Sequence, residues 1–306
     1  MRLSIIVPTH NRLRSLQRLL RSLEAVDCRE TLEAEVLVIN NDSSDGTADF
    51  LSTELLKSRP FTLQVLQEKK LGKANALNLG LASAKGDILL TVDDDIVVHP
   101  QFLRMHLECY RATHFDAVQG RILPGLDPLG RPADPARLRE YNIPLIDHGG
   151  EYREIRGLTG TNMSFKREVF EKVGFFDPRL GPGAAGFSED TEYSMRIRQA
   201  GFKIGYTPHA VVYHELDPQR YGRAYNRNVE YKKGVSRSIY RYDSIFFRVI
   251  PNLLISCFRY CVYQSLGLTQ KAYRAEGRIV KSWGYLAGRA AQREIFKASP
   301  RGMRHS

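Results

Sequence analysis

Three consecutive carboxylates, Asp93, Asp94 and Asp95, follow a short apolar run that ends at Val92. The run 87–92 has the length and composition of a buried strand. Adjacent acidic side chains repel one another and are costly to bury, and a divalent cation removes that cost by taking oxygen ligands. Mg²⁺ and Mn²⁺ keep part of their coordination shell for substrate phosphates. The triad therefore predicts a metal and diphosphate site at the carboxyl end of a central strand, with a solvated acidic turn as the alternative.

Strands and helices alternate along the first third of the chain. Apolar runs predict strands at 3–7, 35–39, 63–66 and 87–92. Apolar residues at helical spacing, or helix-cap residues, lie between them. This alternation is typical of an α/β protein with a mainly parallel sheet, helices on both faces and ligands at the carboxyl ends of the strands. Polar clusters follow three of the strands at 8–12, 40–45 and 93–95, so we expect them to converge on one edge of the sheet.

The second part of the chain is less regular. The predicted elements are a helix at 100–113, a strand at 117–122, a long loop at 123–150, a strand at 156–165, a helix at 168–173, a helix from 189 and a strand at 203–214. A glycine-rich stretch at 181–187 precedes Glu189 and Asp190, and Ser188 is a good helix-start residue. His214 ends the last predicted strand.

Five motifs, taken together and in this order, resemble the family 2 glycosyltransferases. They are residues 6–12, 35–47, 72–78, 93–95 and 188–190. The resemblance covers roughly residues 1–215 and implies a GT-A fold, a nucleotide-sugar donor and an inverting transfer. We expect residues 216–306 to be a separate, basic and amphipathic helical extension.

The resemblance assigns the nucleotide and the sugar to side chains at the ends of the predicted strands. These residues are Pro8, Thr9, Asn11, Arg12, Asn40, Asp42, Lys73, Asp93 and Asp94. Asn40 stands where many family members carry an aspartate that holds the base. An amide offers one acceptor and one donor group in place of two acceptors, so the base stays open and uridine is the default. Helix capping is the alternative role for the loop residues, and a solvated helix start is the alternative for Lys73.

Metal binding and base catalysis are assigned to three further positions. The resemblance gives Asp95 the metal, with His214 completing its coordination, because neutral imidazole suits Mn²⁺-like ions. Asp190 is the candidate catalytic base, since an inverting transfer needs one carboxylate to take the proton of the acceptor hydroxyl. Glu189 would orient it. The metal, Mg²⁺ or Mn²⁺, would neutralise the leaving diphosphate. Helix capping is the alternative for Glu189 and Asp190, and a structural role is the alternative for His214.

The net charge of +11 over 306 residues is concentrated in the last third. Residues 215–306 hold 18 Lys and Arg against 6 Asp and Glu. One helical stripe would hold Arg237, Arg241, Arg248, Asn252 and Arg259, opposite an apolar face around 245–258, with Pro251 kinking or breaking the helix. These features suit an anionic membrane surface. The alternative is that the apolar side packs on the catalytic domain. We expect no membrane span, because charges interrupt every long apolar stretch, and no nucleic-acid partner, because no known module is present.

Two other functions compete with glycosyl transfer. A sugar-phosphate nucleotidyltransferase would need a glycine-rich loop after the first strand, and 8–12 contains no glycine. A non-catalytic membrane or polymer-binding protein would not need both 93–95 and 189–190. The single tryptophan, Trp283, does not lie in the Gln-x-x-Arg-Trp motif of processive synthases of this family, so we expect one sugar per encounter. Scattered cysteines favour a reducing compartment. We therefore expect a cytoplasmic protein, peripheral on the inner face of the plasma membrane, with a lipid-linked or polysaccharide acceptor.

Overall fold

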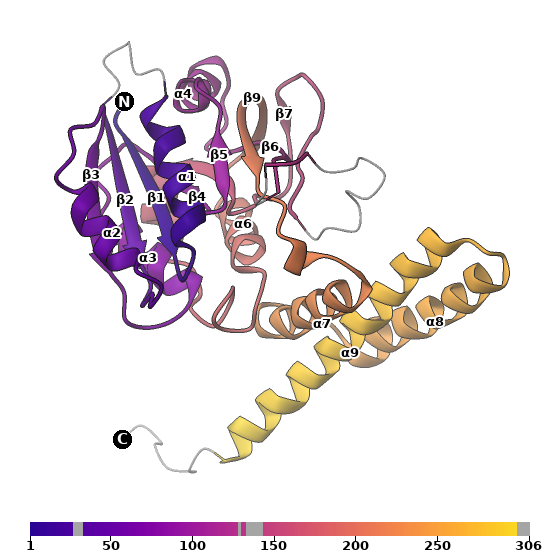
Figure 1. Cartoon of the computed structure of the whole chain (residues 1–306). Coiled ribbons are helices and arrows are strands. Elements are labelled where there is room, and N and C mark those ends of the chain that lie inside the picture. The colour runs from indigo at the N-terminus through magenta and orange to yellow at the C-terminus, as the bar shows by residue number, and fades with distance from the viewer. Residues whose placement is uncertain (27–32, 128–129, 133–142, 299–306) are drawn as a thin grey trace. The chain divides into compact units, whose positions relative to one another are not determined.

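The computed structural model describes residues 1–26, 33–127, 130–132 and 143–298 (Figure 1). Contacts divide the chain into two units. The first comprises Met1–Pro178 and Glu189–Tyr221, and the second comprises Arg179–Ser188 and Gly222–Ser306. The helical unit therefore begins at Gly222, six residues after the start of the predicted extension. It also takes in the glycine-rich stretch that precedes Glu189.

One half of the first unit is a parallel sheet in the order β3 (Thr62–Gln67), β2 (Ala34–Asn40), β1 (Leu3–Thr9), β4 (Ile88–Val92). β1, β2 and β4 are buried along their whole length. Their side chains alternate between two apolar clusters, with Leu3, Ile5 and Val7 in one and Ile6 in the other. Burial on both faces explains why these strands are nearly continuous apolar runs in the sequence.

Helices cover both faces of this sheet (Figure 1). α1 (Leu13–Glu24), α2 (Thr47–Glu54) and α4 (Phe102–Ala112) contribute to one apolar cluster. α3 (Lys73–Ser83), α5 (Arg167–Val173) and α6 (Glu189–Gln199) contribute to the other. The predicted α/β class with helices on both faces is confirmed.

The sheet becomes mixed beyond β4. β8 (Asn162–Lys166) pairs antiparallel with β4 and with β6 (Ala117–Pro124). β9 (Ile204–His214) runs parallel to β6 and antiparallel to β5 (Ile96–Val98) and β7 (Arg153–Glu154). The predicted strand at 156–165 was therefore too long. Residues 156–161 form a connection that contains Gly157 and Gly160, and regular pairing begins only at Asn162.

As far as the structure describes it, the second unit contains three helices and residues 179–188. Two consecutive helices, α8 (Ile250–Ser265) and α9 (Thr269–Ala298), form a hairpin, and α7 (Arg223–Tyr240) is the third helix. α9 packs against α7 and α8, and a π-helical turn, η3 (Ile245–Val249), precedes α8. The predicted arginine stripe is wrong, because Arg237, Arg241 and Arg248 all surround the buried Asp243 at 2.6–3.3 Å. The predicted kink or break at Pro251 falls where the π-helical turn η3 passes directly into α8, and Pro251 lies in the first turn of α8.

One segment of this unit departs from the expectation about membrane spans. Ile245–Ser265 is, by length and composition, long and apolar enough to cross a membrane, and 11% of its most apolar window is buried. The sequence-based prediction considered only stretches without charged residues, so it passed over this segment, which contains two arginines. Length and composition are also compatible with a helix that lies on a membrane surface.

Glycines allow α7 and α9 to approach closely. A Cβ atom at Gly284 would lie 2.1 Å from the backbone oxygen of Tyr231, and one at Gly234 would lie 2.1 Å from the oxygen of Lys281. We therefore expect Gly284→Ala to force the helices apart and to lower the free energy of unfolding of the helical unit by about 1–3 kcal/mol. Urea unfolding followed by the fluorescence of Trp283, which lies in α9, measures this effect.

Gly277→Ala in the same helix is the matched control. Its Cβ would lie 3.4 Å from the flexible Glu230 side chain. Because alanine is the better helix former, this change is expected to raise the same free energy by about 0.5–1 kcal/mol. Equal effects of the two substitutions would contradict close helix packing at Gly284.

Candidate active site

The carboxyl ends of β1 and β4 meet through their loops. Thr9, the last residue of β1, donates a hydrogen bond from Oγ1 to Asp94 Oδ2 at 2.7 Å. Arg12, in the loop after β1, lies 2.7 Å from Asp95 Oδ2. Burial and the adjacent Asp95 carboxylate raise the pKa of Asp94 to about 7. Two of the polar clusters that follow parallel strands thus lie in contact at one edge of the sheet, which is the usual ligand position in such folds.

Asp93, Asp95 and His214 form a group whose ligand atoms lie within 4.8 Å of one another. His214 Nδ1 lies 2.8 Å from the carbonyl oxygen of Glu215, which can only accept, so Nδ1 carries the proton. In a neutral imidazole Nε2 then has the free lone pair, and Nε2 lies 3.5 Å from Asp95 Oδ1. Two carboxylates and one neutral imidazole suit Mg²⁺ or Mn²⁺ and leave positions for phosphate oxygens. The donor set present therefore fits a divalent cation.

Two arginines surround the outer side of Asp95. Arg12 Nη1 and Arg220 Nη1 lie 2.7 Å and 3.2 Å from Asp95 Oδ2, whereas His214 faces Oδ1. Asp217 lies 3.8 Å from Arg12 and 3.6 Å from Arg220. Guanidinium groups at this position are suited to binding the oxygens of a diphosphate. Sequence reasoning missed Arg220 and Asp217 because they follow the strong motifs and lie in the basic tail, although Arg220 is only six residues beyond His214.

Lys73, the first residue of α3, connects the acidic triad to α6. Its Nζ lies 2.5 Å from Asp93 Oδ1 and 3.5 Å from Glu189 Oε1. Thr161 Oγ1, which the sequence did not indicate, donates a 2.7 Å hydrogen bond to the other Asp93 oxygen. Burial would lower the pKa of Lys73, but Asp93 and Glu189 raise it above its ordinary value. Burial likewise opposes ionisation of Asp93, yet the Lys73 ammonium lowers its pKa to about 2.

Glu189 and Asp190 begin α6 and differ in exposure. Glu189 is buried, and this burial raises its pKa to about 7 in spite of the Lys73 charge. Asp190 is half-buried, and it accepts hydrogen bonds from the backbone N–H groups of Gly160 at 3.3 Å and Thr191 at 2.6 Å. Carboxylates in the first turn of a helix also interact favourably with the positive end of the helix dipole. Of the two carboxylates, Asp190 is the one that an acceptor reaches more easily.

The loops after β1 and β2 support each other through amide side chains. Asn11 and Asp42 have left-handed backbones, with φ of 52° and 57°, which asparagine and aspartate tolerate better than most residues. Asn11 Oδ1 accepts a 2.7 Å hydrogen bond from Ser44 N, and Asn40 Oδ1 accepts one of 3.1 Å from Ser43 N. Asn40 is buried and Asp42 is exposed. The Asn40 oxygen thus already accepts one hydrogen bond from its own loop, which engages one of its two lone pairs.

Two buried residues, Pro8 and Asn41, lie at the base of these loops. Pro8 lies within β1 in register with Ile39. Asn41, which the sequence did not single out, donates from Nδ2 to the carbonyls of Glu68 and Lys70, and its Oδ1 accepts from Gly72 N at 2.8 Å. Asn41 thereby fixes the turn that begins α3, and with it the position of Lys73.

Comparison with solved structures identifies the fold class. A mannosyltransferase, PcManGT, from Pyrobaculum calidifontis in complex with GDP-Man and Mn²⁺ is similar over 97% of this chain and 76% of its own, with a TM-score of 0.58 and 18% identity. TarS 1–349 of S. aureus in complex with UDP is similar over 96% of this chain and 92% of its own, with a TM-score of 0.53 and 18% identity. The chain has the GT-A glycosyltransferase fold, as predicted.

Sequence comparison then identifies the family. Residues 4–174, more than half of the chain, match glycosyl transferase family 2, and the chain belongs to this family. A probable glycosyltransferase, YdaM, of Bacillus subtilis (strain 168) is 25% identical over 86% of this chain and 63% of its own length. A poly-beta-1,6-N-acetyl-D-glucosamine synthase of Staphylococcus aureus (strain COL) is 28% identical over 65% of this chain and 47% of its own length. The chain thus spans less than two thirds of the length of these relatives.

Proposed function

We propose that the protein is a metal-dependent, inverting glycosyltransferase that moves one sugar from a nucleotide-diphosphate donor to a hydroxyl acceptor. The observation that carries this proposal is the continuity of the site. Asp93 lies with Asp95 and His214 in the group whose ligand atoms fit a divalent cation, and Lys73 bridges Asp93 to Glu189. Lys73 thus connects the proposed diphosphate site, through ion pairs within the first unit, to the residue next to the proposed catalytic base.

The chain's own residues account for the proton and phosphate steps. Asp190 takes the proton of the acceptor hydroxyl while that oxygen forms a bond to the anomeric carbon. The bond from that carbon to the diphosphate oxygen breaks on the opposite face, so the configuration inverts and no covalent enzyme intermediate is needed. Arg12 and Arg220 bind phosphate oxygens, and Lys73 keeps Asp93 ionised. A divalent cation held by Asp93, Asp95 and His214 would neutralise charge on the leaving diphosphate.

For the donor and the acceptor we propose only a chemical class. A uridine donor is supported by the structures of TarS with UDP and with UDP-GlcNAc, whereas PcManGT was solved with GDP-Man. The name of the poly-beta-1,6-N-acetyl-D-glucosamine synthase supports a role in the assembly of cell-surface polysaccharide or glycolipid. A lipid-linked or polysaccharide acceptor fits a cytoplasmic protein at the inner face of the plasma membrane, which is the location that we propose.

Release of the leaving group tests this function against its alternatives. In the presence of Mn²⁺ we expect the protein to release a nucleoside diphosphate from at least one nucleotide sugar in a panel, with UDP-sugars the first candidates. A sugar-phosphate nucleotidyltransferase would instead release pyrophosphate from a nucleoside triphosphate and a sugar phosphate. A non-catalytic binding protein would release neither, and its melting temperature would not rise with a nucleotide sugar. Pyrophosphate release, or no release and no shift, would refute the proposal.

A further inference from the structure

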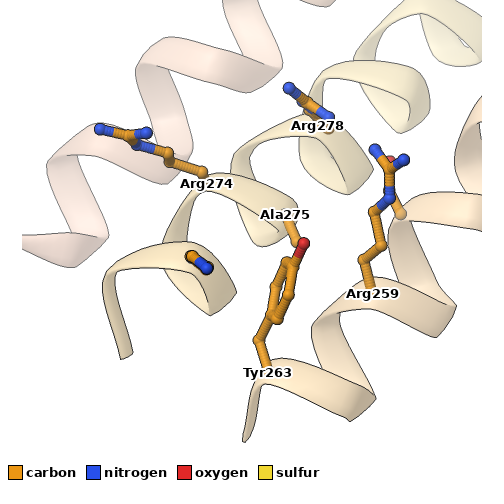
Figure 2. A pocket seen from close by; sticks show the side chains of 7 residues that line it. Arg259, Tyr263, Arg274, Ala275 and Arg278 are labelled. Atoms are coloured by element: carbon orange, nitrogen blue, oxygen red, sulfur yellow. The ribbon is translucent and has the colours of Figure 1, made fainter. Parts of the chain in front are cut away.

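The helical unit contains a cavity of about 330 Å³ between α8 and α9. Figure 2 shows Arg259 and Tyr263 on one helix, extending toward the helix that carries Arg274, Ala275 and Arg278. Lys271 also lines the cavity, and its Nζ lies 5.9 Å from the centre of the Tyr263 ring. Four cationic side chains thus surround one space that has room for a small anionic group.

The four cations of this cavity have no carboxylate partner within ion-pair distance in the part of the chain that the structure describes. Glu276, the acidic residue beside Ala275, is engaged by Arg223 at 2.8 Å and by Arg227 at 3.6 Å. Elsewhere in the same unit, by contrast, Asp243 forms ion pairs with three arginines. Unpaired cations that line a cavity are suited to phosphate oxygens, which form charge-assisted hydrogen bonds with arginine.

An apolar surface lies on the segment that leads into this cavity. Phe246, Phe247 and Phe258 are 76%, 90% and 70% exposed, and Leu254 is 63% exposed. Phe258 directly precedes Arg259, so the two side chains lie about 100° apart around α8. A helix that presents aromatic side chains on one side and basic side chains next to them is typical of the boundary between acyl chains and headgroups.

We propose that the cavity binds the phosphate headgroup of an anionic membrane lipid while the exposed aromatic side chains of η3 and α8 enter the acyl region. The charge of the cavity selects the headgroup, and the apolar surface selects a lipid over a soluble phosphate. The cavity volume of about 330 Å³ accommodates a phosphate or a diphosphate. This inference rests on the helical unit alone and stands whether or not the proposed transfer reaction is correct.

Vesicle flotation with the full chain tests the proposal. Vesicles of phosphatidylcholine that contain phosphatidic acid are compared with vesicles in which oleate supplies the same negative charge. The wild-type protein is expected to bind the phosphatidic acid vesicles more tightly. Replacing Arg259, Arg274 and Arg278 together with glutamine should weaken that binding on the order of a hundred-fold, because each basic residue near an anionic surface strengthens binding roughly five-fold.

A charge-matched control separates the cavity from the general charge of the protein. Arg14, Arg21 and Arg111 are exposed residues of the first unit with no ion pair among the described residues, and their joint replacement with glutamine should leave binding nearly unchanged. Equal losses in the two triple variants, or equal binding of oleate vesicles, would overturn the phosphate site. If the cavity triple variant is unstable, the single exposed change Arg259→Glu is used instead, and it should weaken binding roughly 25-fold because it changes the charge by two.

Two further arms test whether the ligand is a lipid. Phe246→Ser combined with Phe247→Ser should weaken vesicle binding without changing the weak binding of glycerol phosphate, measured by calorimetry in chelator. If glycerol phosphate binds as tightly as the vesicles, the ligand is a soluble phosphate. If bound protein resists salt of about 1 M, where the screening length is about 3 Å, and also alkaline carbonate, Ile245–Ser265 crosses the membrane. Either result would overturn the proposal.

Discussion

Asp190→Asn is expected to reduce sugar transfer by about 10²–10⁴-fold, the usual contribution of a general base, and to leave donor binding nearly intact. Asparagine keeps the size of the side chain and can still accept the hydrogen bond from Gly160 N or Thr191 N. It lacks the basic oxygen that would take the acceptor proton. The donor is held elsewhere in the proposed site, by Asp93, Asp95 and the loop that carries Arg12. Turnover and donor affinity are measured for the same preparation.

Glu189→Gln is the matched control for this experiment. Glu189 is buried against Lys73, so its replacement by the isosteric amide is expected to cause a smaller loss of turnover. Near wild-type turnover in Asp190→Asn, or greater damage in Glu189→Gln, would show that Asp190 is not the base. Loss of donor binding in both variants would show instead that the pair acts only in starting α6.

Asp95→Ala is expected to remove the dependence of nucleotide binding on metal. For the wild-type protein, calorimetry should give tight UDP binding in Mn²⁺ and weak binding in chelator. Loss of groups that merely orient metal ligands costs about 10–100-fold in metal affinity, so removal of a ligand should weaken Mn²⁺-supported binding by about 100-fold or more. Arg12 and Arg220, released from Asp95, would remain beside the diphosphate. The residual binding in this variant should therefore be the same with Mn²⁺ and with chelator.

Asp49→Ala, an exposed acid in the first turn of α2, is the control for the loss of one negative charge. It should keep the full response to Mn²⁺. Asp94→Ala should lose less than Asp95→Ala, because Asp94 faces Thr9 and is not part of the group with His214. Equal UDP affinity of the wild-type protein in Mn²⁺ and in chelator would contradict the metal site altogether.

Local patterns predicted the parallel half of the fold well. The strands around β1, β2 and β4 are nearly continuous apolar runs because both faces of the sheet are covered, and the polar residues that follow them lie at one edge. The mixed half was harder to predict. The run 156–165 is apolar enough for one strand, but Gly157 and Gly160 allow a connection that brings Thr161 to Asp93. No local pattern indicates which distant strand β8 pairs with.

Side-chain partners that are distant in sequence account for the remaining differences. The arginines 237, 241 and 248 have the spacing of a helical stripe, but the chain turns between α7 and η3 so that all three reach Asp243. Arg220 and Asp95 meet only because β9 returns alongside β5 and ends near the triad. Asn41 looks like any other polar loop residue until its three backbone partners are known.

The division between the buried strands and the polar loops at their ends has an evolutionary consequence. The strands are specified by apolar side chains buried in two clusters, and most of the proposed donor contacts lie in loops outside these clusters. A lineage can therefore exchange loop residues such as Asp42 and explore new donors with little penalty in stability. Asn41 is an exception, because it is buried and bonds the backbone of three other residues. We infer that Asn41 changes more slowly among related chains than its exposed neighbour Asp42.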